Sequence, residues 1–325
     1  MGTKCIICNS ENIEDFNALP CPFVIHRMYA DKHFEKESLY HCKDCGMYWS
    51  SFRPNKEEVN RYYKNYMEEE YILERDKYEE GFAKWRHDYD KENGLKKELH
   101  VRKEFMRNLF RKYIDLAKIE TVLDYGGARG EFIIDEFKNA KKYVYDIDSI
   151  EPIKSNIKKI SEEELQPSSY DFIQCCHTLE HVSKPIDLIK DMLNLLKPEG
   201  YLYIEVPFED FFENIINTPN STFFIHEHIN FYRLSVFEKF FNKPNFIILE
   251  NNVVEQSEHF GQNKIIACLI KYTHNTEINA AFNKIHNILI QLNFCMDILQ
   301  NAQNQISQND KNITELYNRS DELRN

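Results

Sequence analysis

The sequence predicts an α/β protein. Its main domain is expected to be a doubly wound, mostly parallel sheet of the Rossmann type, preceded by a zinc ribbon and followed by a helical tail. Two C-x-x-C pairs lie near the start of the chain, short apolar runs alternate with helical patterns in the middle, and an apolar stripe runs through the end. The 325 residues, of which 42% are hydrophobic, suffice for one such domain with smaller attachments.

The chain divides into four segments. Residues 1–54 form the cysteine-bearing module, and residues 55–120 form a charged, Tyr-rich helical connector. Residues 121–272 alternate between strand and helix patterns, and residues 273–325 form the helical tail. The third segment is expected to carry the chemistry, since ligands of parallel α/β sheets bind at the carboxyl ends of the strands.

Four cysteines at the start of the chain predict a structural zinc site. Cys5, Cys8, Cys42 and Cys45 form two C-x-x-C pairs, and four thiolates complete the tetrahedral shell of zinc. Gly46 can adopt the backbone conformation that a zinc knuckle needs after its second cysteine. A redox role or free thiols are the alternative, although one redox pair would not need a second. With four sulfurs bound no position stays open for water, so this zinc is expected to hold structure.

Six short apolar runs predict the strands of the main sheet. Each is short enough for a strand, and helical patterns separate most of them. That rhythm is typical of a parallel α/β sheet. The runs are Thr121–Leu123, Tyr143–Tyr145, Tyr170–Cys175, Tyr201–Val206, Phe246–Leu249 and Lys264–Ile270.

The first of these strands leads into a glycine-rich turn, after which we expect a helix. Asp124 ends the strand, and the turn contains Gly126, Gly127, Ala128 and Gly130. Glycine lets a ligand approach the backbone because no Cβ intervenes. The acid at the strand end can orient the loop or meet an ammonium group of a ligand through water. The turn therefore predicts a cofactor-binding loop.

A second acid follows the next strand. Asp146 suits a carboxylate that accepts two ribose hydroxyls, and Asp148 is the runner-up. A dinucleotide enzyme is a weaker alternative, because G-x-G-x-x-G does not occur and an acid two residues before the first glycine is not part of that fingerprint. A purely structural β–α turn is weaker still.

The glycine loop and later segments resemble one family. Asp124-x-Gly126-x-Ala128-x-Gly130 resembles the first motif of class I S-adenosylmethionine-dependent methyltransferases, usually D-x-G-x-G-x-G. Ala128 stands where the middle glycine is expected. Residues 170–181 and 196–207 resemble later motifs of the same family in the same order. With the zinc ribbon, residues 51–54, the pair Tyr62 and Tyr63, and residues 226–232, the chain resembles zinc-ribbon methyltransferases of bacterial sugar and surface-glycan pathways.

The resemblance implies a transferase that uses S-adenosylmethionine on a small, sugar-like acceptor. By the family pattern, Ser161 borders the adenine and His177 lies near the sulfonium. Related sugar C-methyltransferases carry a further C-terminal domain, and the tail here is too short for its core, which favours oxygen over carbon as the acceptor atom. The alternative from another class is a binding or assembly protein that keeps the fold without catalysis.

Two histidines in the segment that follows the strand ending at Pro207 after a long loop are the candidates for catalysis. In an extended stretch His226 and His228 share one face, and the glutamate between them points away. A largely neutral imidazole is a suitable general base for a sugar hydroxyl. The alternatives are that these histidines cap or pack the segment, or that His177 or His181 is the base. Metal binding by His226 and His228 is a weaker alternative, because the sequence offers no clear third ligand.

Composition and the tail limit the kinds of partner that the protein can have. Lys and Arg number 41 against 53 Asp and Glu, and the formal charge of −12 opposes binding to nucleic acid. Because the sequence has neither an apolar run of about 18 residues nor the apolar core of a signal peptide, we expect a cytoplasmic protein that binds no membrane.

The tail stripe has the heptad period, which suits a helix packed on its own domain and a homo-oligomer contact equally. It comprises Ile278, Phe282, Ile285, Leu289, Leu292, Met296 and Leu299, and continues to Ile306 and Ile313.

Overall fold

The computed structural model describes residues 3–29, 37–66, 68–147, 150–209, 222–255 and 264–273, and the single positions 288, 299 and 303. The chain forms two compact units, Met1–His274 and Asn275–Asn325, and every element below belongs to the first. Nearly all of the tail stripe, and with it the predicted oligomer contact, lies outside the described residues. No described helix is long and apolar enough to cross a membrane.

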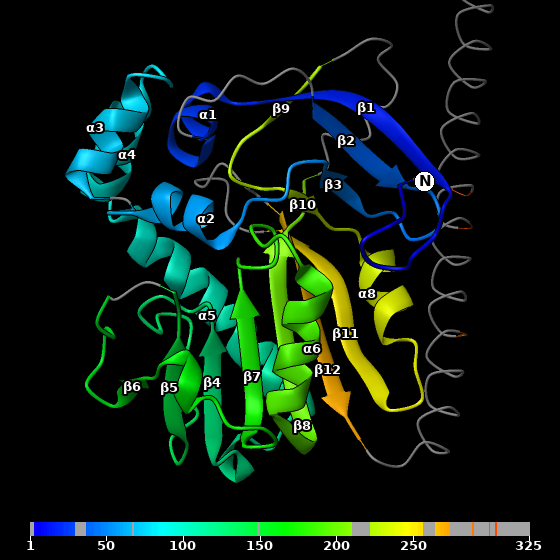
Figure 1. The fold of residues 1–325 in the computed structure, drawn as a ribbon. Helices are drawn as coiled ribbons and strands as arrows, with labels where there is room; N and C mark the ends of the chain where they lie inside the picture. Colours follow the sequence, from blue (N-terminus) through cyan, green and yellow to red (C-terminus); the bar gives the residue numbers. More distant parts are fainter. Residues whose placement is uncertain are drawn as a thin grey trace, which may run out of the picture. The chain divides into compact units, whose positions relative to one another are not determined.

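The sheet of the N-terminal module takes its two edge strands from residues far along the chain (Figure 1). Its central strands are β1 (Ile13–Pro20), β2 (Glu37–Cys42) and β3 (Tyr48–Ser50). At one edge β9 (Phe223–Ile225) pairs parallel with β1, and at the other edge β10 (Asn230–Phe231) pairs antiparallel with β3. The few residues between β9 and β10, which include the two candidate histidines, therefore span this sheet.

Helices fill the predicted connector. Asn55 begins the first of them, because its side chain accepts hydrogen bonds from the amides of Glu57 and Glu58, and the Glu58 carboxylate accepts one from the Asn55 amide. The described helices of the N-terminal half are α1 (Pro22–Tyr29), α2 (Lys56–Tyr63), α3 (Glu69–Asp76), α4 (Phe82–Lys91), α5 (Gly94–Tyr113) and the short η1 (Leu116–Lys118).

The main sheet has seven strands in the order β11-β12-β8-β7-β4-β5-β6. Strands β8, β7, β4, β5 and β6 run parallel, and β12 runs antiparallel between β8 and β11. The predicted doubly wound, mostly parallel sheet is confirmed. The strands are β4 (Thr121–Tyr125), β5 (Lys141–Tyr145), β6 (Ile157–Lys159), β7 (Tyr170–Cys176), β8 (Leu196–Pro207), β11 (Phe246–Glu255) and β12 (Lys264–Tyr272).

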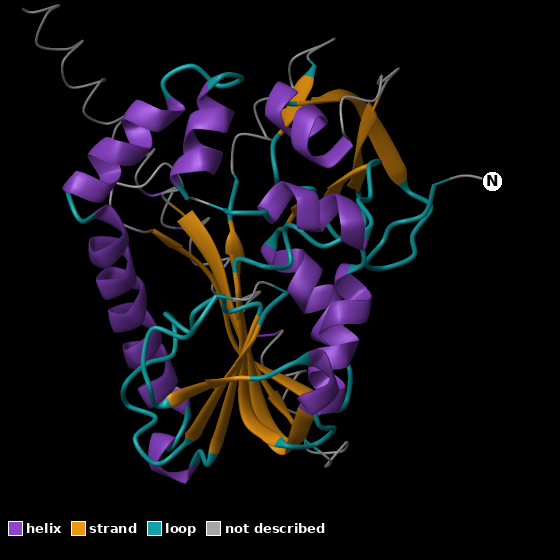
Figure 2. Ribbon diagram, turned by 60° about the vertical axis from the view of Figure 1, so that its left-hand side comes forward, coloured by secondary structure: helices purple, strands orange, loops and turns teal. Residues whose placement is uncertain are grey.

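Different helices cover the two faces of this sheet (Figure 2). Successive strand residues point to opposite faces. Val122 therefore packs in one cluster with Phe110 of α5, and its neighbour Leu123 packs in the cluster on the other face. That second face is covered by α6 (Pro185–Leu195) and α8 (Leu234–Phe241). The sheet thus has an apolar core on each side, which is what near-continuous apolar strands require.

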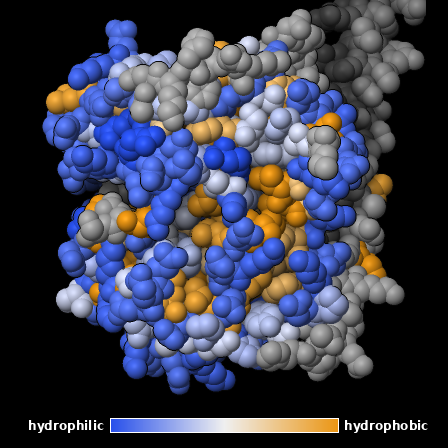
Figure 3. All heavy atoms as spheres, in the orientation of Figure 1, coloured by the Kyte–Doolittle hydropathy of each residue, from blue (hydrophilic) through white to orange (hydrophobic). Residues whose placement is uncertain are grey.

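Helix α6 buries one side only. Ile189 and Met192 are buried against the sheet, whereas Ile186, Leu188 and Leu193 are only partly buried. In the space-filling view of Figure 3, hydrophobic side chains remain visible on this face around the place of α6.

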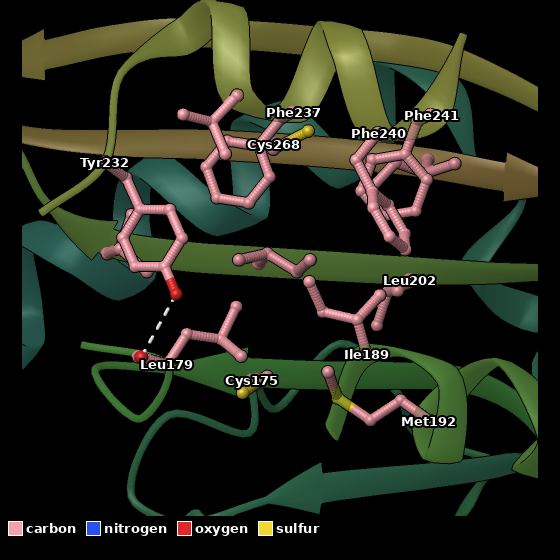
Figure 4. Packing of buried hydrophobic residues seen from close by; sticks show 14 of the residues in the cluster. Cys175, Leu179, Ile189, Met192, Leu202, Tyr232, Phe237, Phe240, Phe241 and Cys268 are labelled. Carbon is pink, nitrogen blue, oxygen red and sulfur yellow. Dashed lines mark hydrogen bonds between the residues drawn. The ribbon is translucent and has the colours of Figure 1, made fainter. Parts of the chain in front are cut away.

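Helix α8 completes the same core. Phe237, Phe240 and Phe241 are buried against the sheet and α6 (Figure 4). Just before the helix, the hydroxyl of Tyr232 donates a hydrogen bond of 3.1 Å to the carbonyl of Leu179. This bond fixes the chain after β10 to the segment that follows β7.

One prediction about the main sheet is wrong, because no helix follows the glycine turn. The connection between β4 and β5 consists of successive turns. A five-residue strand rises about 17 Å, and a helix rising 1.5 Å per residue needs roughly eleven residues to run back that far. Fewer residues than that separate Gly130 from Lys141, the first residue of β5. Ile133, Ile134 and Phe137 nevertheless bury their side chains in the cluster on the α5 face.

Candidate active site

The predicted cofactor residues gather at the carboxyl edge of the main sheet. The sheet reverses its winding between β4 and β7, and ligands of open α/β sheets bind outside the strand ends at such a point. Thr178, just after β7, donates a hydrogen bond of 3.3 Å to the carbonyl of Gly126. A Cβ on Gly126, where φ is 73°, would lie 2.5 Å from the Thr178 hydroxyl oxygen. The glycine loop therefore packs directly on the segment after β7.

Asp124 is fully buried beneath the glycine loop. A Cβ on Gly127 would lie 2.2 Å from Cγ of Asp124, so glycine is needed for the loop to close over this carboxylate. Neither carboxylate oxygen has a hydrogen-bond partner among the described residues. Burial, assisted by the nearby charge of Asp146, raises the pKa of Asp124 to about 7. A fully buried acid with a raised pKa beneath a glycine loop indicates a ligand site.

Asp146 lies directly after β5, where the sequence predicts it. One of its oxygens accepts a hydrogen bond of 2.8 Å from the backbone amide of Ala128. The amide of Gly126 donates one of 2.7 Å to the carbonyl of Tyr145. These two bonds tie the glycine loop to the end of β5 and bring both predicted acids to one loop. Asp148 lies outside the described residues.

Ala128 and Ser161 complete the predicted cofactor set. Ala128 has a φ of 45°, in the left-handed region where a side chain costs roughly 1–2 kcal/mol. The backbone at Ala128 thus has a conformation that glycine would adopt at lower cost. Ser161 is exposed just after β6 and caps the short η2 (Glu162–Glu164). It therefore belongs to the same edge of the sheet as the two acids.

His177 lies directly after β7, between two buried carboxylates. Its Nε2 lies 3.3 Å from Oε1 of Glu205 on β8, and its Nδ1 lies 3.5 Å from Oε1 of Glu180. Glu205 also pairs with the buried guanidinium of Arg102 from α5. Although burial opposes ionisation, Arg102 and His177 hold the pKa of Glu205 at about 2. His177 therefore lies beside a fixed negative charge at the strand edge.

Glu180 anchors the histidine-bearing segment. Its backbone carbonyl accepts hydrogen bonds from the amides of Ile229 (2.8 Å) and Asn230 (3.1 Å). Its side chain is only 1% exposed, and neither carboxylate oxygen has a hydrogen-bond partner among the described residues. Nε2 of His181 lies 3.7 Å from its Oε1. The segments after β7 and before β10 thus form one cluster.

The two candidate bases have different surroundings. The ring of His228 lies 4.8 Å from that of His181, and its Nδ1 lies 2.7 Å from Oε1 of Glu209. Although burial opposes it, Glu209 raises the pKa of His228 to about 9. The His226 side chain is 52% exposed, and Cys21 and Glu79 raise its pKa to about 10. Of the two, His228 is the one that belongs to the cluster around Glu180.

The four predicted zinc ligands come together. Sγ of Cys5 lies 3.6 Å from that of Cys45, and Sγ of Cys8 lies 3.5 Å from that of Cys42. All four sulfurs lie within 4.8 Å of one another, a set that fits a tetrahedral ion after slight closure. The hydroxyl of Ser235, on α8, donates to the carbonyl of Cys45 at 2.8 Å. The cysteine cluster is therefore fixed to the main domain.

Sequence reasoning missed several members of the site. Tyr63 of α2 lies with its hydroxyl 2.8 Å from Nδ1 of His181, and Arg102, Glu180, Glu205 and Glu209 complete the charged network. The run of titratable residues from His177 to His181, directly after an apolar strand, was the available signal for Glu180. Nothing local in the sequence marks the contact of Tyr63 with His181 or that of Arg102 with Glu205, because each pair is separated by more than a hundred residues.

The buried charge of Asp124 leads to a stability prediction. Because its pKa in the folded protein is raised from 3.8 to about 7, the native state holds this proton more tightly than the unfolded chain does. Stability is therefore lost as the pH rises between these values, up to roughly 4 kcal/mol. We expect Asp124→Asn to raise the Tm of the ligand-free protein at pH 8 and to raise it less at pH 5. Calorimetric scans measure both Tm values, with Asp15→Asn, at an exposed position, as the control. An equal increase in Tm at both pH values would exclude the charge of Asp124 as the cause of the increase.

The fold and the edge site together define a class of enzyme. The sheet has seven strands, one of them antiparallel, and at its carboxyl edge a glycine loop lies over a buried acid beside a second acid that follows the next strand, as the resemblance to class I methyltransferases implies. The family model described as a methyltransferase domain matches residues 66–251, more than half of the chain. The chain belongs to this family and is an S-adenosylmethionine-dependent methyltransferase.

Several solved structures of methyltransferases match part of the chain at low identity. The 1,6-didemethyltoxoflavin N1-methyltransferase of Burkholderia thailandensis, with S-adenosylhomocysteine bound, is 12% identical over 59% of this chain and 87% of its own, with a TM-score of 0.39. The N-methyltransferase NodS of Bradyrhizobium japonicum is 15% identical over 53% and 87%, with a TM-score of 0.38. Likeness at this level carries no information about the acceptor. No curated protein sequence matches the chain.

Proposed function

We propose that this enzyme transfers the methyl group of S-adenosylmethionine to an oxygen of a small, sugar-like acceptor. In the simplest form of the proposal, the neutral form of His228 takes the proton of this oxygen; because Glu209 raises the pKa of His228 to about 9, methyl transfer is expected to speed up as the pH rises toward that value. One observation carries the proposal: the segment after β7 contacts the glycine loop through Thr178 and the His228 segment through Glu180. The cofactor loop and the imidazole cluster thus belong to one continuous set of contacts.

The chemistry of the cluster supports a hydroxylated acceptor. Methyl transfer needs a nucleophile in line with the sulfonium methyl, and a neutral hydroxyl becomes a competent nucleophile when a base removes its proton. His228 has Glu209 on its Nδ1, a pairing that stabilises the imidazolium formed after proton uptake. Glu180, His181 and Tyr63 add further polar groups that suit hydroxyls of the acceptor. The resemblance to sugar and surface-glycan methyltransferases points to the same class of molecule.

Asp146 is proposed to hold the ribose of the cofactor. Losing a carboxylate that accepts hydrogen bonds from two hydroxyls costs about 1.5–3 kcal/mol. We therefore expect Asp146→Ala to weaken cofactor binding roughly ten- to hundredfold. Calorimetric titration with S-adenosylhomocysteine measures the change. Asp15→Ala, at an exposed position on β1, is the control, and equal affinities in both variants would remove Asp146 from the ribose site.

We also propose that the four cysteines bind one structural zinc ion per chain. The convergence of the four sulfurs in one small module supports this. Four thiolates fill the tetrahedral shell of zinc and leave no position open for water, which is typical of a structural site. Zinc bound here would fix the β2–β3 hairpin, because Cys42 ends β2 and Cys45 lies in the turn before β3. Elemental analysis of the purified protein tests the stoichiometry.

The reaction is tested directly with a methyl-labelled cofactor. The full-length protein is incubated with the labelled cofactor and a panel of sugar nucleotides and free sugars, and products are examined by mass spectrometry and NMR. We expect the label on an oxygen of a hydroxylated acceptor. Label on carbon would instead indicate a sugar C-methyltransferase, and transfer confined to nitrogen acceptors would contradict the proposal. Comparing glycans of a strain lacking the gene with those of its parent then identifies the natural acceptor.

A further inference from the structure

We propose that Glu180, His181 and His228 bind a divalent metal ion on which the acceptor hydroxyl docks. One ligand atom from each of these residues lies within 4.8 Å of the others. Donor atoms around an ion with bonds of about 2.1 Å lie roughly 3–4 Å apart, so small side-chain movements close the set. This site is separate from the cysteine cluster. That an acceptor hydroxyl docks on the ion rests on the proposed function.

The carboxylate of Glu180 provides the first argument. It is 1% exposed, and neither oxygen has a hydrogen-bond partner among the described residues. The imidazoles of His177 and His181 lie 3.5 and 3.7 Å from its Oε1, and they balance its charge only when protonated. A buried carboxylate left without a partner costs several kcal/mol. A metal ion between Glu180 and the imidazoles removes that cost.

The orientation of the two imidazoles provides the second argument. Nδ1 of His228 lies 2.7 Å from Oε1 of Glu209. Nδ1 of His181 lies 2.8 Å from the Tyr63 hydroxyl and 3.2 Å from the carbonyl of Glu227. Histidines that bind metals characteristically use one ring nitrogen for a carboxylate or carbonyl and coordinate with the other. These contacts leave Nε2 of both rings for the ion.

The ligand set indicates the class of metal and its use. Two imidazoles and one carboxylate suit divalent ions such as Mn²⁺, Fe²⁺ or Zn²⁺ and leave coordination positions open for hydroxyls of the acceptor. A coordinated hydroxyl is more acidic. It loses its proton to water, its oxygen bonds to the methyl carbon, and the carbon–sulfur bond breaks to release S-adenosylhomocysteine. Since a coordinating Nε2 does not also take the proton, His228 then acts on the hydroxyl through the ion.

Manganese alone provides a direct binding test. The zinc-loaded, full-length protein is titrated with Mn²⁺, and electron paramagnetic resonance measures the free ion. We expect one Mn²⁺ per chain and at least tenfold weaker binding in Glu180→Gln and in His228→Gln. Glu14→Gln removes the carboxylate of another His–Glu pair, that of His41 on β2, and should bind as the native protein does. Affinity for S-adenosylhomocysteine shows that each variant is folded.

The outcomes separate this inference from the proposed function. Absence of Mn²⁺ binding at millimolar concentration, or equal binding by Glu180→Gln and the native protein, overturns the metal site. Methyl transfer to a hydroxyl that a chelator leaves unchanged also overturns it, and the general-base form of the proposed function then stands. Mn²⁺ binding that depends on Glu180, in a protein that methylates no hydroxylated acceptor, supports the metal site and contradicts the proposed function.

Discussion

Replacing Cys42 by alanine is expected to lower methyl transfer at least a hundredfold while changing cofactor affinity by less than about threefold. Structural zinc contributes on the order of 10 kcal/mol to the folding of small modules, so losing one thiolate should unravel the β2–β3 hairpin. That hairpin holds β10 through the pairs Trp49 with Asn230 and Tyr48 with Phe231. The glycine loop and its two acids lie on the other sheet and keep their contacts.

This prediction follows from the way the His226–His228 segment is held. Strands β9 and β10 flank that segment and pair with β1 and β3, so the module that carries the cysteines positions the histidines. Rates, elemental analysis and cofactor titration of Cys42→Ala are compared with those of Cys268→Ala, a buried thiol on β12 that should leave the zinc in place. Normal turnover in Cys42→Ala without zinc would contradict the account.

His228→Ala is expected to lower turnover about 10²–10⁴-fold with cofactor binding intact. Removal of a general base has an effect of this size. Turnover also falls in His228→Ala if His228 holds a metal ion beside the acceptor. The variant leaves the glycine loop untouched, because the contacts of His228 are with His181 and Glu209. Single-turnover measurements with the labelled cofactor isolate the transfer step.

His226→Ala is the matched comparison, since it removes the other imidazole of the same segment. We expect turnover close to normal, because His226 is half exposed and contacts Glu79 rather than the cluster. If His226→Ala loses activity and His228→Ala does not, the assignment of the two residues is reversed. If both variants turn over normally, the base is to be sought at His177, beside Glu180 and Glu205.

The strands of the main sheet were predictable because their signal is local. Each predicted apolar run lies within a strand, since both faces of this sheet are buried and the runs are nearly continuous. Strand β6 escaped prediction because Ile157 is its only apolar residue. The helix expected after Gly130 has the right apolar spacing in Ile133, Ile134 and Phe137, but the connection is too short for it.

The site was predictable only in part, because half of it depends on contacts distant in sequence. Asp124, Asp146 and the glycines follow strands directly, so their positions follow from the sheet. Strands β9 and β10 have three and two residues, too few to show a period, and their partners lie in the N-terminal module. The pairing of β9 with β1 and of β10 with β3 positions His228 in the cluster around Glu180.

Calorimetric titration of the native, full-length protein with S-adenosylhomocysteine decides whether the loop over Asp124 binds the cofactor. We expect one binding site per chain, with affinity weakened at least tenfold by Asp146→Ala and unchanged by Asp15→Ala. Absence of binding at millimolar S-adenosylhomocysteine, or binding that Asp146→Ala leaves as strong as in the native protein, would contradict the account.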